Sequence, residues 1–75
     1  MKAQHEVAYN INAVRDRRIS AGISGMSMAR VMGLNVPTYY KKEAGQIKWS
    51  LDESKALADF FKTTIDELFF GEKVA

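Results

Sequence analysis

The sequence predicts an all-α fold built from five short helices. Apolar residues recur at spacings of three, four and seven positions, and no segment shows a convincing strand pattern. Residues that favour helix starts precede several of these stretches, twice in the order hydroxyl, apolar, acidic, acidic. The run Ala29-x-x-x-Gly33, with Glu43-x-Gly45 ten residues later, is typical of two short helices joined by a tight turn.

The first helix is expected from about Tyr9 to Ala21, with a possible earlier start. One face is marked by positions i, i+4, i+7 and i+11, which are Val7, Ile11, Val14 and Arg18. Gly22 follows, and glycine is the common residue just past a helix end.

The second and third helices form the predicted helix-turn-helix. Ser24 is expected to cap the second, which runs to about Met32, and Asn35 the third, which runs to about Lys42. Pro37 then falls in the first turn, where its missing N–H is tolerated. Four apolar residues are expected to face inward: Met28, Met32, Leu34 and Tyr39. A loop from 44 to 49 follows.

Two capping boxes are predicted to open the last helices, Ser50 with Glu53 and Thr64 with Glu67. Their acidic residues also suit the positive end of the helix dipole. The residues expected to face the core from these helices are Leu51, Leu57, Ala58, Phe61, Ile65, Leu68 and Phe69.

Composition excludes several classes of function. The 75 residues suit one domain, and the chain has no Cys and a single His, His5, without a partner. No nucleophile and base are paired, so we expect no catalytic residue, no metal and no cofactor. No apolar run approaches a membrane span, and the first ten residues lack the apolar core of a signal peptide. We therefore expect a cytoplasmic, nucleoid-associated protein.

Charge is unevenly distributed along the chain. Residues 1–48 contain eight basic and three acidic side chains, a net of +5, whereas residues 49–75 contain three basic and six acidic ones, a net of −3. The basic half contains the helix-turn-helix, whose second helix typically enters the DNA major groove. A basic surface is what phosphate binding requires, although this signal alone is weak.

The chain resembles the phage repressor and Cro-type helix-turn-helix family over residues 11–71. The matching pieces, in order, are Val14 to Ser24, Ala29-x-x-x-Gly33-Leu34, Thr38 to Gly45, and Ile65-Asp-Glu-Leu-Phe69. This resemblance implies a five-helix lambda-repressor-like domain across 1–75, with a core at about 9–71 and the helix-turn-helix at about 24–43. It also implies a transcriptional regulator, most similar to a short Cro-like repressor of a phage or mobile element, and often a two-fold homodimer. The dimer contact would involve the last helix and the tail after Phe70.

The resemblance also implies a set of DNA-binding residues. The third helix would be the recognition helix, with Asn35 at its tip and Val36, Pro37, Thr38, Tyr40 and Lys41 facing the groove. Thr38 and Tyr40 could bond base edges or phosphate, and Lys41 a guanine edge or a phosphate. Ser24 would lie at a helix start suited to phosphate. Gln46 and Lys48 would contact the flanking backbone.

Arg18 and Glu43 match a buried ion pair of the family. Arg18 lies on the apolar face of the first helix, which favours the pair over two solvated charges. Removing one partner of such a pair is destabilising. Glu43→Ala is therefore expected to lower the melting temperature by several degrees.

Three positions depart from the family pattern. Gly25 replaces a Gln that commonly touches phosphate, and Lys42 replaces an apolar residue, so its stem would pack while its ammonium reaches water. Val36-Pro37 removes polar readers from the start of the recognition helix. These departures keep an alternative open: a protein-binding modulator or anti-repressor that uses the same fold to dock on another repressor.

Overall fold

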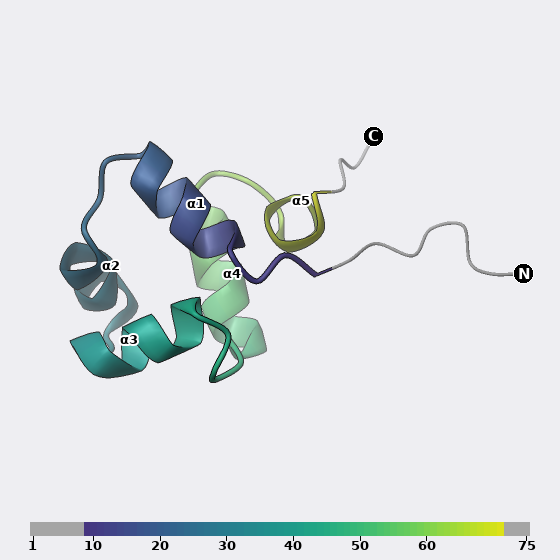
Figure 1. Cartoon of the computed structure of the whole chain (residues 1–75). Helices are drawn as coiled ribbons and strands as arrows, with labels where there is room; N and C mark the ends of the chain where they lie inside the picture. The colour runs from purple at the N-terminus through teal and green to yellow at the C-terminus, as the bar shows by residue number, and fades with distance from the viewer. Residues whose placement is uncertain (1–8, 72–75) are drawn as a thin grey trace, which may run out of the picture.

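The computed structural model describes residues 9–71, which form five α-helices and no strand (Figure 1). Their bounds are α1 Ala13–Ser20, α2 Gly25–Met32, α3 Val36–Glu43, α4 Leu51–Phe60 and α5 Ile65–Phe70. The predicted all-α, five-helix fold class is confirmed. His5, Val7 and the tail expected to join a dimer lie outside the described residues.

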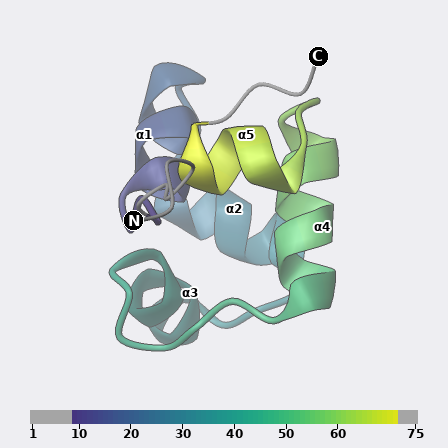
Figure 2. The ribbon, with the colours of Figure 1, turned by 90° about the vertical axis from the view of Figure 1, so that its right-hand side faces the viewer.

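The helices fall into two groups. α2 packs against α3, while α5 packs against both α1 and α4. Figures 1 and 2 show α3 along the lower edge of the molecule, with α1 and α5 above it. The second helix of the helix-turn-helix therefore lies at the periphery, where one side of it is open.

Four predicted helix caps are present. The side chains of Ser24, Asn35, Ser50 and Thr64 each accept a hydrogen bond from the backbone N–H three residues on. Each such bond satisfies a donor that the helix leaves unpaired, worth about 1 kcal/mol. The Ser50 capping box is complete, because Glu53 accepts from the Ser50 N–H at 2.8 Å. The second box is not, since the Glu67 carboxylate accepts from the Thr63 hydroxyl instead.

The first helix begins later than predicted, at Ala13 instead of near Tyr9. The Asn10 side chain accepts from the Asn12 N–H at 3.0 Å, and the Asn10 N–H donates to the Phe69 carbonyl at 2.8 Å. These bonds hold the segment before Ala13 in a turn against α5. The Tyr9 ring stacks on Phe69 with centroids 5.5 Å apart, so this turn extends the core.

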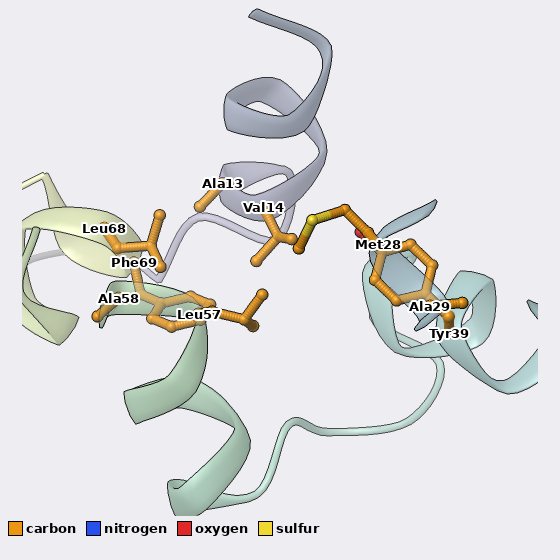
Figure 3. Close-up of a cluster of buried hydrophobic side chains, with 9 residues drawn as sticks. All are labelled: Ala13, Val14, Met28, Ala29, Tyr39, Leu57, Ala58, Leu68 and Phe69. Atoms are coloured by element: carbon orange, nitrogen blue, oxygen red, sulfur yellow. The ribbon is translucent and has the colours of Figure 1, made fainter. Parts of the chain in front are cut away.

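The core joins all five helices (Figure 3). Val14 and Met28 point toward each other, linking the α1 side of the core to the helix-turn-helix. The buried members are Ala13, Val14, Met28, Ala29, Tyr39, Leu57, Ala58, Leu68 and Phe69. The half-buried residues around them are Ile23, Met32, Leu34, Val36, Trp49, Phe61, Ile65 and Phe70.

The prediction that Leu51 faces the core is wrong. Leu51 is 77% exposed, although it precedes the buried Ala58 by seven positions and so shares its helix face. The reason is its place along the axis, since it is the first residue of α4 and lies outside the core cluster.

Among the helices within residues 9–71, none combines the length and apolar character needed to span a bilayer.

Candidate nucleic-acid interface

The turn between α2 and α3 sets the angle at which α3 is presented. Gly33 adopts a φ of 70°, which costs glycine little, and the Leu34 N–H bonds back to the Ala29 carbonyl at 2.9 Å. Ala29 is 1% exposed, so its small side chain lies within the contact between the two helices. The Asn35 cap then starts α3 directly. The geometry of this turn therefore follows from three short-range features of the sequence.

The predicted ion pair between Arg18 and Glu43 is present and holds α1 against the end of α3. The guanidinium donates two hydrogen bonds to the carboxylate, Nε to Oε2 at 2.7 Å and Nη2 to Oε1 at 3.1 Å. Its Nη1 donates to the Ile23 carbonyl at 3.0 Å. The Tyr39 hydroxyl donates to the same Glu43 carboxylate at 2.6 Å. Glu43 is thus the centre of a network joining three segments.

This network shifts two pKa values. The hydrogen bond to Glu43 raises the pKa of Arg18, so its charge is secure at any physiological pH. Burial, followed by the hydrogen bond to Glu43, raises the pKa of Tyr39. The phenol therefore remains a hydrogen-bond donor, as the carboxylate requires.

The Lys42 ammonium is paired with an acidic side chain, whereas the sequence-based expectation placed it in water. Its ammonium donates to both oxygens of Glu53, at 2.7 and 2.9 Å, and the side chain is only 13% exposed. Burial raises the pKa of Glu53, but the bonds from Lys42 and Ser50 outweigh this and lower it. One carboxylate thus both caps α4 and ties α4 to the last turn of α3.

The open face of α3 differs in part from the predicted one. Pro37 and Lys41 are exposed, Tyr40 is 45% exposed, and Thr38 is half-buried. Val36 was expected to face the major groove of DNA, but its side chain packs against the protein core. The reason is helical spacing, since Val36 shares a face with the buried Tyr39 and Glu43 at i+3 and i+7.

An open groove of about 640 Å³ runs between α1 and the second half of α3. It brings together three of the predicted DNA-binding residues, Tyr40, Lys41 and Gln46, with the predicted ion pair of Arg18 and Glu43. The sequence analysis did not select Asn12 and Arg15, which line the same groove from the α1 side. Arg15 could have been found, because it lies three positions before Arg18 and hence on a neighbouring part of the same helix surface.

Other predicted residues lie apart from this groove. Lys48 lines a separate hollow of about 460 Å³. The apolar walls of that hollow include Tyr9, Ile11, Ile47 and Trp49. Ser24 and Asn35 are exposed at the starts of α2 and α3, where their side chains are engaged as helix caps.

Gly25 is buried beneath the side chain of Tyr40. A Cβ placed on Gly25 would overlap the Tyr40 hydroxyl and would lie 2.7 Å from Cε1 of that ring. The Tyr40 ring is also 6.0 Å from the Arg18 guanidinium carbon. The Tyr40 side chain thus contacts both α2 and α1, and this arrangement was not foreseen from the sequence.

Fold and groove together define a small all-α domain with a helix-turn-helix and a cation-lined groove beside its second helix. Comparison with known proteins finds neither a family model nor a curated protein that matches the chain.

Proposed function

We propose that this protein is a sequence-specific, DNA-binding transcriptional regulator, a short Cro-like repressor that inserts α3 into the major groove of duplex DNA. The observation that carries the proposal is the position of α3. It lies at the edge of the molecule with Pro37 and Lys41 exposed, beside a groove that holds Arg15, Lys41 and Gln46. A helix presented in this way, with basic side chains beside it, matches the requirements of major-groove binding.

The residues divide between two roles. We assign contacts with base edges or phosphates to Lys41, which is exposed on α3, and to Thr38, which is half-buried. Arg15 and Gln46, from either side of the groove, are placed to contact the sugar-phosphate backbone. Occupancy of a site near a promoter would block polymerase, which requires no second binding surface.

The proposed function includes binding to DNA as a homodimer. Two copies with recognition helices about 34 Å apart would read half-sites about 10 base pairs apart. Sedimentation at increasing concentration, with and without a selected duplex, would test it. A monomer bound to a single half-site under all conditions would refute the dimer but leave the groove assignment intact.

The first experiment is duplex binding across a salt gradient. Between about 50 and 200 mM salt, each phosphate contact should weaken binding to random duplex about 3.5-fold. Lys41→Ala should reduce the slope of log affinity against log salt by about 1. Lys55→Ala is the matched control, because it removes the same charge from α4, outside the groove. Equal slopes for the two variants would refute the assignment.

The second experiment selects bound duplexes from a random pool. A shared motif is expected, and the combined replacement of Thr38, Tyr40 and Lys41 by alanine should abolish its binding with helical content unchanged. If that variant binds as tightly as the parent, α3 is not the recognition helix.

The alternative function, a protein-binding modulator, is favoured by one observation. Met26 and Val31 of α2 are 55% and 53% exposed, which offers apolar contact for a protein partner. Gly25 no longer supports it, because that glycine has a packing role beneath Tyr40. A modulator would bind duplex weakly at every salt concentration, so the salt gradient separates the two functions.

A further inference from the structure

Gly25 occupies a position where glycine is not required by the backbone. It is the first residue of α2, and its φ lies outside the left-handed region that favours glycine. Alanine is the better helix former under such conditions. The neighbouring space explains the glycine instead, because a Cβ would overlap the Tyr40 hydroxyl and Cζ. The phenol of Tyr40 therefore fills the space that a side chain at position 25 would occupy.

Tyr40 is held on its other sides as well. Its ring lies edge-on to that of Tyr39, with centroids 5.7 Å apart and planes at 71°. The Arg18 guanidinium faces the ring from α1 and is itself fixed by Glu43. Tyr40 is thus turned back toward α1 and α2, although nearly half of its surface remains exposed.

We propose that Gly25 is a positioning residue that holds the Tyr40 hydroxyl over the start of α2, where it contacts the phosphodiester backbone of duplex DNA and not a base edge. This inference rests on the proposed function. The hydroxyl lies against Gly25, the first residue of α2, whereas the exposed residues Pro37 and Lys41 mark the part of α3 that approaches the bases in the proposed function. Tyrosine hydroxyls commonly donate to phosphate oxygens, and such contacts carry no sequence information directly.

Binding measurements with Tyr40→Phe, Gly25→Ala and the double variant test this inference. Tyr40→Phe keeps the ring but removes the donor. It should weaken binding to a selected duplex and to random duplex by the same factor, about ten- to a hundredfold. Gly25→Ala should displace the hydroxyl and cause a similar loss, and the double variant should lose no more than either single one. Met26→Ala, an exposed neighbour in the same helix turn, is the matched control and should bind like the parent.

Two binding results would overturn the inference. A loss confined to the selected duplex would make Tyr40 a base-reading residue. Losses that multiply in the double variant would show that Gly25 and Tyr40 act independently.

A stability measurement tests the packing without nucleic acid. Gly25→Ala should raise the melting temperature in a Tyr40→Ala background, where the space is empty, but not in the parent. An equal rise in both backgrounds would refute the steric coupling and leave the proposed function untouched. If the parent protein does not bind duplex DNA in low salt, both proposals are refuted. The melting temperatures of the four variants would still report on the contact between Gly25 and Tyr40.

Discussion

Replacement of Glu43 by alanine would remove the carboxylate that accepts hydrogen bonds from two buried side chains, Arg18 and Tyr39. The Arg18 and Glu43 side chains are 11% and 5% exposed, and the Tyr39 side chain is fully enclosed. Without the carboxylate, Arg18 retains only the Ile23 carbonyl as acceptor, and the Tyr39 hydroxyl has no acceptor within the described residues. The variant should therefore lose more free energy of unfolding than the removal of an ordinary ion pair would cost.

The magnitude follows from burial. Breaking a buried pair by removing one partner costs about 3–5 kcal/mol, and a stranded neutral donor alone costs about 1–3 kcal/mol. These two costs overlap, so we expect a loss of about 4 kcal/mol, or about 15–30 °C in melting temperature for a domain of this size. This exceeds the several degrees expected from the sequence, because the Tyr39 hydroxyl also depends on Glu43. A chain of this length has about 4–11 kcal/mol in total, so the variant should be marginally folded.

Urea and thermal unfolding followed by circular dichroism would measure the effect. Asp59→Ala is the matched control, because it removes an acid from an ion pair with Lys55 whose side chains are 68% and 64% exposed. That variant should change stability by less than about 1 kcal/mol. Glu43→Gln, which keeps an acceptor, should fall between the two. If Glu43→Ala and Asp59→Ala unfold alike, the network around Glu43 does not stabilise the fold as argued.

Three further predictions concern the rest of the fold. The pKa of Glu53 is lowered in the folded state, so the stability it contributes is complete above its ordinary value of 4.5 and is lost as pH falls through the lowered value. Glu53→Gln should therefore lose less stability than the parent when unfolding is compared above and below pH 4.5; an identical acid loss would contradict this. Leu57→Ala should cost about 2–5 kcal/mol, because the side chain is fully enclosed, whereas Leu51→Ala should change stability by less than about 0.5 kcal/mol in the same urea titration. Thr64→Ala should cost about 1 kcal/mol through loss of the α5 cap, and a melting temperature equal to the parent's would show that this cap contributes nothing.

Features set by neighbours in the sequence could be predicted well. The caps at Ser24, Asn35, Ser50 and Thr64 involve partners three residues away, so local pattern suffices. The second capping box was wrong because Thr63 supplies a competing hydroxyl to Glu67. The start of α1 was also wrong, since a backbone bond from Asn10 to Phe69 overrides the apolar spacing.

Features set by distant partners could not be predicted from local pattern. Lys42 finds Glu53 eleven residues away, and Gly25 meets Tyr40 across the helix-turn-helix. The pairing of Arg18 with Glu43 was expected from the place of Arg18 on the apolar face of the first helix and from a family resemblance inferred from the sequence. No local pattern joins the two residues, which lie 25 positions apart. Helical spacing places a residue on a face, but it does not show which helix that face will meet.

The ion pair inside the fold also limits how strongly the groove attracts polyanions. Three cations line it, Arg15, Arg18 and Lys41, but Glu43 already neutralises Arg18, and the Arg15 guanidinium lies 3.7 Å from the exposed Asp16 carboxylate. A polyanion bound in the groove would therefore release at most about two of its own counterions, to Arg15 and Lys41. Long-range attraction is modest as a result, and discrimination between ligands must come from close contacts of shape and hydrogen bonding along α3.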